Sequence, residues 1–335
     1  MGQLHDVLIA RGQYELRLGA QDKEERRRID IAANIMAEEQ QRIAFTHPGL
    51  CLTVLPYKRI PDDESWVRDR GDVALSIHPL PGDDGKRRGV PYGSKARLIL
   101  LFLQAEAVKT RSRVIELGSS MAQWMDRMGL SIGGTSYRII EEQAERIEHC
   151  VLTFTHRGPE GKVRWQDSIV RGSFDPFGRR KAGTPHPKTV ELSETFFNAL
   201  LRHPVPISER AIQLLSERCM PLDIYLWLAY RLHSLERDVP ISWRALFDQF
   251  GACTRQLKHF KPRFARDLEM ALAAYPEARV VLREEGVLLS PSPPPVYPRL
   301  RVVGPPSRRA LAARVAPQDA SEPTGVAGTS LSGRR

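Results

Sequence analysis

A run of basic residues ahead of and within a predicted helix carries the clearest chemistry in the sequence. Five basic residues, histidine included, fall within the nine positions 258–266, with no acidic residue among them. Phe260 and Phe264 mark the buried stripe of this helix, so the cations point elsewhere. Long cationic side chains on a helix pair with phosphates or with guanine O6 and N7. We therefore expect DNA binding through Arg255, Lys258, His259, Lys261, Arg263 and Arg266. The alternative is a solvated basic face partnered by Asp267 and Glu269.

A second predicted helix, Thr135–His149, has a different charge pattern. Thr135, Ser136 and Arg138 lie at its start, where a helix in the major groove contacts base edges, and Arg146 lies further along. Four glutamates share the segment, and acidic side chains repel phosphate. Two hypotheses stay open for these residues: contact with DNA, or contact with a second copy of the chain.

Further cations lie in a predicted β-hairpin and in the segment that follows it. Lys162 and Arg164 belong to the hairpin, and Arg179, Arg180 and Lys181 follow in a basic segment with two prolines. Phosphate contact and solvated charge are equally consistent with these positions. We include Lys162 and Arg164 in the predicted DNA-binding set.

Motifs of catalysis and metal binding are missing from the sequence. It contains no His-x-His pair, no phosphate-binding Gly-x-x-x-x-Gly-Lys loop and no Gly-x-Ser-x-Gly. The four cysteines are scattered, which argues against a zinc or iron–sulfur site. The acidic run Asp62–Glu64 is typical of a solvated loop. We expect no enzyme activity, no cofactor and no metal.

Composition points to a polyanion as partner. The 335 residues carry a formal net charge of +10, which favours binding to nucleic acid or to an anionic membrane. The longest apolar run, Leu98–Leu103, is far shorter than the ~20 residues of a membrane span, and we find no signal peptide at the N-terminus. Scattered single thiols fit a reducing compartment. We expect a cytoplasmic protein with no membrane contact.

The elements that must position these cations occur twice in the same order: helix, helix, helix, hairpin. In the first half the predicted elements are helices Lys95–Lys109, Ser119–Met128 and Thr135–His149, a short strand Val114–Leu117, and strands Val151–His156 and Val163–Val170. In the second half they are helices Leu222–Leu235, Trp243–Phe250 and His259–Tyr275, then strands Ala278–Leu282 and Val287–Leu289. This order is typical of the winged helix, a helix-turn-helix with a hairpin wing.

The predicted fold is therefore α+β and mainly helical, with two winged-helix domains and a disordered C-terminal tail. We expect an N-terminal extension (1–21), a first domain (22–177), a linker (178–190), a second domain (191–290) and an Arg/Pro-rich tail (291–335). The first domain includes a helix over 22–45 and strands Leu50–Leu55 and Val73–Ile77. A strand Val190–Leu192 and a helix Ser193–Leu201 bridge to the second domain.

Several blocks, in the right order, resemble the plasmid-encoded RepA replication initiator family. The first-half blocks are VPYGSKARLILLFLQAEAVKT (90–110) and IELGSSMAQWMDRMGLSIGGTSYRIIEEQAERIEHCVLTF (115–154). The second-half blocks are LDIYLWLAYRL (222–232), ISWRALFDQFG (241–251) and FKPRFARDLEMALAAYP (260–276). The resemblance spans roughly 22–289 and leaves out the first ~20 residues and the tail.

The resemblance implies a function that composition alone cannot indicate. Proteins of this family have two winged helices, bind repeated elements at a plasmid origin, promote duplex opening, and recruit host initiation and helicase-loading proteins. Many repress their own gene, which links them to copy control, and their first domain is associated with homodimer formation. Two alternatives remain: a winged-helix transcriptional repressor, and a protein-binding scaffold without sequence-specific DNA binding.

Overall fold

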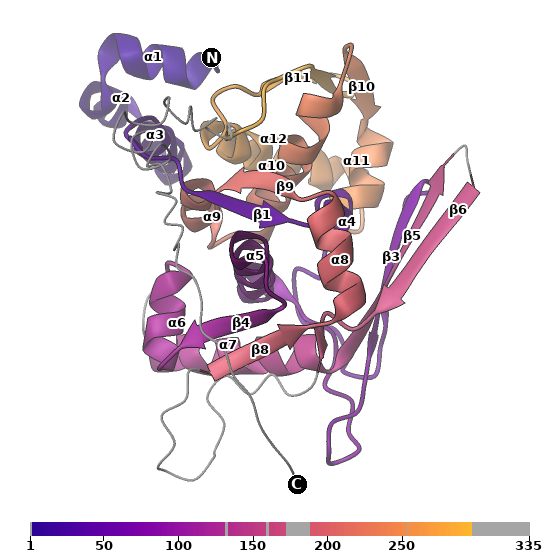
Figure 1. Ribbon diagram of the computed structural model, residues 1–335. Coiled ribbons are helices and arrows are strands. Elements are labelled where there is room, and N and C mark those ends of the chain that lie inside the picture. The colour runs from indigo at the N-terminus through magenta and orange to yellow at the C-terminus, as the bar shows by residue number, and fades with distance from the viewer. Residues whose placement is uncertain (1, 131–132, 159–160, 172–187, 253, 297–335) are drawn as a thin grey trace, which may run out of the picture. The chain divides into compact units, whose positions relative to one another are not determined.

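The computed structural model describes residues 2–130, 133–158, 161–171, 188–252 and 254–296, which belong to one compact unit, Met1–Val296. Helices dominate this part of the chain and the strands form small antiparallel sheets, so the predicted α+β class is confirmed (Figure 1). Within it, no helix is long and apolar enough to cross a membrane.

The N-terminal region contains three helices where one was predicted. α1 (Gln3–Arg11) and α2 (Gln13–Gly19) occupy the predicted extension. Asp22 is the N-cap of α3 (Lys23–Met36), because its carboxylate accepts the Glu25 N–H at 2.7 Å. The predicted helix over 22–45 is thus too long, because the chain then extends as β1 (Ile43–Thr46) and pairs with β9 (Val205–Ser208).

The predicted strand Leu50–Leu55 is wrong. The chain instead forms the short helix α4 (Pro48–Leu52), with proline at its first position and the His47 ring as its cap. His47 Nδ1 accepts the Gly49 N–H at 3.0 Å, and burial lowers the pKa of His47 to about 4. A short apolar run has the same sequence pattern whether it forms a buried helix or a buried strand, which explains the error.

A four-stranded antiparallel sheet carries the first hairpin. Its order is β2-β3-β5-β6, from β2 (Trp66–Asp69), β3 (Val73–Pro79), β5 (Cys150–Gly158) and β6 (Gly161–Asp167). The predictions of strand Val73–Ile77 and of the hairpin are confirmed. The predicted strand Val163–Val170 is interrupted at Ser168, and its end forms β7 (Val170–Arg171) in another sheet.

The three helices of the first half are confirmed as α5 (Gly93–Thr110), α6 (Met121–Arg127) and α7 (Gly134–Glu148). Ser120 caps α6, since its hydroxyl accepts the Gln123 N–H at 3.2 Å. The strand before α6, β4 (Val114–Gly118), does not pair with the hairpin. It pairs with β8 (Lys188–Leu192), which lies between β4 and β7.

Two short helices lead into the second half. α8 (Glu194–Arg202) and α9 (Glu209–Leu215) are capped by Ser193 and Ser208, and the predicted helix Ser193–Leu201 matches α8. α10 (Cys219–Arg231) continues as a 3₁₀ turn, Leu232–Ser234.

The second half follows its predicted order closely. β10 (Val239–Ser242) leads into α11 (Trp243–Phe250), then α12 (Leu257–Ala273), β11 (Arg279–Arg283) and β12 (Gly286–Ser290), with sheet order β10-β12-β11. α11 and α12 pack through aromatic rings, with Trp243 edge-on to Phe260 and Phe264. Pro262 is the sixth residue of α12.

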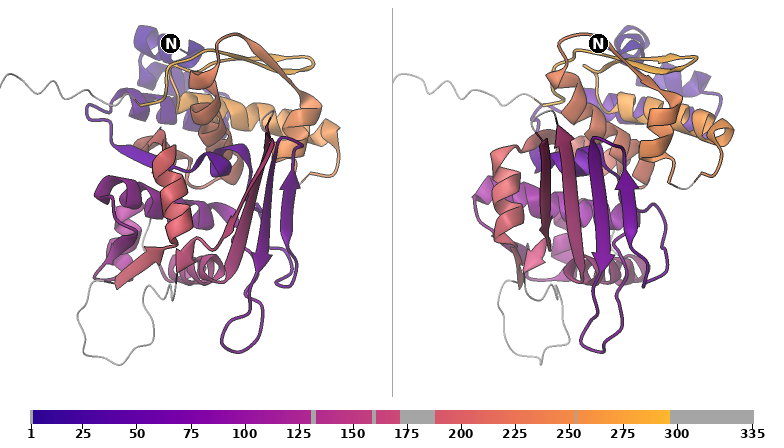
Figure 2. Two further views of the ribbon diagram at one scale, coloured as in Figure 1. Left: turned by 45° about the vertical axis from the view of Figure 1, so that its right-hand side comes forward. Right: turned by 90° about the vertical axis from the view of Figure 1, so that its right-hand side faces the viewer.

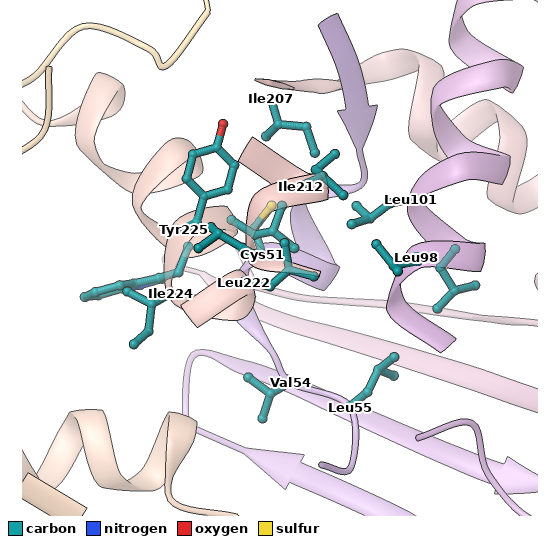
Figure 3. Packing of buried hydrophobic residues seen from close by; sticks show 14 of the residues in the cluster. Cys51, Val54, Leu55, Leu98, Leu101, Ile207, Ile212, Leu222, Ile224 and Tyr225 are labelled. Atoms are coloured by element: carbon teal, nitrogen blue, oxygen red, sulfur yellow. The ribbon is translucent and has the colours of Figure 1, made fainter. Parts of the chain in front are cut away.

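The two halves share one core. α5 packs against β1, α7 and α10, and the core side chains in Figure 3 come from both halves, including Leu98 of α5 and Leu222 of α10. Within this core Arg97 donates to both carboxylate oxygens of Asp223, at 2.7 and 2.8 Å. Removal of either partner would leave an uncompensated buried charge, so this pair ties α5 to α10.

The C-terminal end of the described unit extends past the predicted boundary at 291. Ser292 donates its N–H to the Leu232 carbonyl at 3.2 Å, the Tyr275 hydroxyl donates to Pro293 O at 2.6 Å, and Val296 is fully buried. Residues 291–296 therefore pack on the fold rather than belonging to the predicted tail. The rest of the tail and residues 178–187 of the predicted linker lie outside the described residues.

Candidate nucleic-acid interface

α12 separates its apolar and its basic residues onto opposite faces. Phe260 and Phe264 have no exposed surface, whereas Lys258, His259 and Arg266 are exposed. Lys258 and Arg266 are eight positions apart, so they lie on one side of the helix, two turns apart. Arg255, also exposed, stands just before the helix. Among the described residues none of these four cations forms a salt bridge, which leaves them available to a ligand.

Lys261 and Arg263 flank this exposed face and are partly engaged within the protein. The Lys261 ammonium lies 5.5 Å from the centre of the Trp243 ring, a cation–π contact. Arg263 Nε lies 3.9 Å from Asp267 Oδ2, and 41% of the Arg263 side chain remains exposed. Both side chains keep part of their surface exposed to solvent.

The two acidic residues of α12 are held by other elements. Asp267 is almost fully buried and pairs with Arg218 at 2.8 Å. Burial raises the pKa of Asp267 above the ordinary value of 3.8, although the positive charge of Arg218 acts to lower it. Glu269 pairs with Arg28 of α3. The alternative of a basic face neutralised by Asp267 and Glu269 is supported by the ion pair of Arg263 and by a longer electrostatic attraction between Arg266 and Asp267.

Arg146 of α7 must be withdrawn from the predicted DNA-binding set. It is 3% exposed, and its guanidinium donates to Asp62 at 2.8 Å and to Glu142 at 3.0 Å. The same group lies 5.1 Å from the centre of the Tyr92 ring. A DNA contact would require breaking this buried network, which fixes α7 to the loop around Asp62.

The start of α7 lies on the surface but shares it with acids. Thr135 and Arg138 are exposed and Ser136 is half-buried. Glu141 and Glu145 are also exposed, and Glu145 pairs with Arg88 at 2.7 Å. The mixed surface leaves both hypotheses for Thr135, Ser136 and Arg138 open.

The β5–β6 hairpin presents cations near its turn. Lys162 and Arg164 are exposed on β6, and Arg164 donates to Gln166 at 2.7 Å. Opposite Lys162 stands Arg157, which sequence reasoning did not select and which pairs with Asp69 at 2.9 Å. The cations Arg179, Arg180 and Lys181 lie outside the described residues.

The hairpin end of this sheet lies beside α11. Arg70, in the turn between β2 and β3, and Gln249 of α11 both donate to the Leu52 carbonyl, each at 3.2 Å. Figure 2 shows this end of the sheet next to the helices of the second half. The hairpin cations and α12 therefore belong to neighbouring parts of the same unit.

One further exposed cation lies on α11. Arg244 has 77% of its side chain exposed and pairs with Asp248 of the same helix at 3.2 Å. The spacing of the buried residues Trp243 and Leu246 could have identified it as outward-facing.

No group of three or more potential metal ligands occurs within the described ranges. Asp62, part of the acidic run considered in the sequence, is instead bound by Arg59 and Arg146.

Residues 90–245 match the family model described as "Plasmid encoded RepA protein". Over this segment, from just before α5 into α11, the chain is similar to that family, which supports the predicted resemblance there. The match ends before α12, so the cations of α12 lie outside it.

Two solved structures are similar to the chain. "Crystal structure of SeMet derivatives of domain2 and domain 3 of RctB" has 12% identity and a TM-score of 0.46, and the alignment covers 73% of this chain and 95% of that one. "Crystal structure of the RctB domains 2-3, RctB-155-483" has 10% identity and a TM-score of 0.44, with coverage of 72% and 94%. This likeness is too low to support an argument. No curated protein sequence matches the chain.

Proposed function

We propose that the chain is a non-enzymatic plasmid replication initiator that binds repeated DNA sequences at its origin, with the first half of α12 in the major groove. The observation that carries this proposal is the exposed face of Lys258, His259 and Arg266, none of which forms a salt bridge among the described residues. A helix that presents several cations on one side suits both phosphate pairing and base contacts.

A winged helix is the framework we propose for the second half. α10, β10, α11, α12 and the β11–β12 hairpin follow one another in the order of that motif, and β10 pairs with β12 to close a three-stranded sheet. Gly286 allows this closure, since a Cβ there would lie 1.9 Å from the Ile241 carbonyl oxygen. The hairpin then forms the wing beside the recognition helix.

The first half is proposed as a modified winged helix. α5, β4, α6, α7 and the β5–β6 hairpin have the right order. The hairpin, however, pairs with β3, and β4 pairs with β8, so the wing belongs to a larger sheet. We assign Lys162 and Arg164 of this wing to phosphate contacts, which position a protein on DNA without reading its sequence.

The later steps of initiation are inferred from the family. We propose that the bound protein promotes duplex opening, recruits host initiation and helicase-loading proteins, and contributes to copy control in the bacterial cytoplasm. A transcriptional repressor would use the same α12 contacts, and direct repeats beside the gene, rather than one palindrome, favour the initiator.

The test is binding to the DNA that flanks the gene, against a scrambled duplex of equal length, across a salt series. The proposal predicts a preference for flanking DNA that survives physiological salt. Arg263→Ala should weaken binding by about 1–3 kcal/mol if this side chain reads a base. Arg202→Ala, an exposed arginine at the end of α8, is the matched control.

If both duplexes bind equally and the binding disappears with salt, the protein has only a general affinity for polyanions, and the proposal is rejected. Little affinity for any duplex would favour the scaffold alternative.

A further inference from the structure

A cleft of about 350 Å³ lies between α5, α6, α9 and the start of β1. We refer to it as the α5–α9 cleft. Its apolar lining comes from side chains that belong to the core, among them Ala44 of β1, Leu101 of α5 and Ile212 of α9. Charged side chains of the same elements also line it. An apolar lining with a few charged groups, in a volume of this size, is typical of a site for a small molecule.

Four of the charged side chains form a continuous series of ion pairs along the cleft. Arg127 of α6 and Lys109 of α5 both pair with Glu106, at 2.5 and 3.9 Å. Lys109 also pairs with Glu209, the first residue of α9. The Arg127 guanidinium lies 4.9 Å from the centre of the Phe102 ring. This network joins α6, α5 and α9, and it neutralises two cations and two acids of the lining.

The other two charged residues of the lining, Arg42 and Asp126, are exposed and have no ion pair within the described ranges. Arg42 lies beside the start of α9, because its carbonyl accepts the Glu209 N–H at 3.0 Å. Asp126 lies closer to Gln213, since its carbonyl accepts the N–H of Gly129 at 2.8 Å. A Cβ at Gly129 would lie 2.8 Å from Gln213 Cγ. The cleft therefore offers one cation and one acid at different positions along α9.

The spacing of these two positions suits a ligand with a charge at each end. Glu209 and Gln213 are four residues apart, a rise of about 6 Å along the helix. Two residues of extended chain span about 7 Å, so the ammonium and the carboxylate of a dipeptide are separated by a comparable length. Apolar side chains of the dipeptide would contact the apolar lining. A ligand with only one charge would pair with only one of Arg42 and Asp126.

We propose that the α5–α9 cleft binds a small zwitterion with an apolar body, of the class of apolar dipeptides, with its carboxylate on Arg42 and its ammonium on Asp126. Both contacts are charge-assisted hydrogen bonds, which are stronger than neutral ones. The inference goes beyond the proposed function, because the cleft contains no residue of α12 or of the β5–β6 hairpin and the readout needs no DNA.

The experiment titrates the full-length chain with the dipeptide leucylphenylalanine in an isothermal titration calorimeter. The dissociation constant should be about 1 mM or lower, as expected for a ligand of this size. The same dipeptide with an acetylated amine and an amidated carboxylate keeps the apolar body but loses both charges. It should bind about tenfold more weakly or worse.

Arg42→Gln and Asp126→Asn test the two ends of the ligand separately. Each should raise the dissociation constant of the free dipeptide about tenfold, because one charged contact is lost. The amidated dipeptide, which keeps only its ammonium, should be insensitive to Arg42→Gln, and the acetylated one should be insensitive to Asp126→Asn. Arg202→Gln, at the exposed end of α8, is the matched control and should leave the constant unchanged. Far-UV circular dichroism checks that each variant is folded.

No saturable heat up to about 10 mM dipeptide would overturn the inference. Equal affinity for the free and the doubly blocked dipeptide would also overturn it, and so would an unchanged constant in both variants, because binding would then depend on the apolar lining alone. A chain that binds the dipeptide as expected but shows no preference for flanking DNA would reject the proposed function and leave this inference intact.

Discussion

α7 and α12 hold the same place in the two halves of the chain, each as the last helix before a hairpin, but they carry opposite surfaces. α7 contains four acidic residues and two arginines, and α12 contains four lysines and arginines and two acidic residues. In each helix one residue of the minority charge is buried: Arg146 in α7 and Asp267 in α12. Other elements neutralise that buried charge, through Asp62 in the first case and Arg218 in the second.

The comparison shows that element order alone does not assign a recognition helix. In each helix one residue whose charge is opposite to that of most others is buried in an ion pair. The remaining charged residues, mostly of one sign, face solvent. The exposed surface of each helix is therefore more uniform in charge than its sequence. By this criterion α12 suits a phosphate backbone, whereas α7 suits a polar or protein environment.

The largest expected effect comes from removing the buried cation of α7. Arg146→Met should lower the free energy of unfolding by about 1–3 kcal/mol, because Asp62 and Glu142 lose their common partner while both stay partly exposed to water. Chemical denaturation measures this change. The salt dependence of DNA binding by the folded fraction should stay as in wild type, and a shallower slope would show that Arg146 contacts phosphate after all.

Substitution of an exposed cation of α12 should leave stability unchanged and alter the salt dependence of DNA binding. Lys258→Ala should leave stability within about 0.5 kcal/mol, since the side chain is exposed and unpaired among the described residues. Its loss should reduce the slope of log K against log salt by about 0.9 if it neutralises one phosphate. Unchanged binding would remove Lys258 from the interface.

The carboxyl groups of Asp62 and Asp267 should affect stability in opposite directions as the pH changes. Burial opposes ionisation of Asp62, but hydrogen bonds from Arg59 and Arg146 hold its pKa below 3.8, so its contribution is present above pH 3.8 and lost as pH falls through the lowered pKa. Burial raises the pKa of Asp267, so its contribution is present below pH 3.8 and lost as pH rises through the raised pKa.

Denaturation of Asp62→Asn and Asp267→Asn across the acid range tests this contrast. Asp62→Asn should flatten the loss of stability on the acid side, and Asp267→Asn should flatten the loss that accompanies rising pH. The same pH response from both variants would contradict the opposite environments assigned to the two carboxyl groups.

The smallest effect is expected on the exposed acidic face of α7. Glu141→Lys replaces an exposed acid by a cation. If α7 lies away from DNA, specific affinity should change by less than about 0.5 kcal/mol at physiological salt, where distant charges are screened. A large gain in affinity, measured in the same titration, would place α7 close to the duplex.

Local signals were sufficient to predict most helices and the hairpins. The predicted helices Ser119–Met128 and Trp243–Phe250 match α6 and α11, which Ser120 and Ser242 cap, and the aromatic stripe of α12 is buried as its spacing indicates. The family resemblance also came from the sequence, through blocks that span both halves.

The predictions that were wrong or missing concern contacts between residues far apart in the sequence. Arg146 was predicted to contact DNA from its place on the helix, yet its decisive partner, Asp62, lies 84 positions earlier. The pairing of β1 with β9 and the packing of α1 on the end of α12 are likewise long-range. No periodicity within a short window reports such contacts.

The most direct test of the account compares one arginine from each helix on the flanking duplex: Arg266→Ala in α12 and Arg138→Ala in α7, both exposed in the structure. Affinity is measured for each across the same salt series. The account predicts that Arg266→Ala weakens binding by about 1–3 kcal/mol or flattens the salt slope by about one unit, whereas Arg138→Ala has a clearly smaller effect. Equal losses, or a larger loss for Arg138→Ala, would contradict the assignment of α12 as the recognition helix.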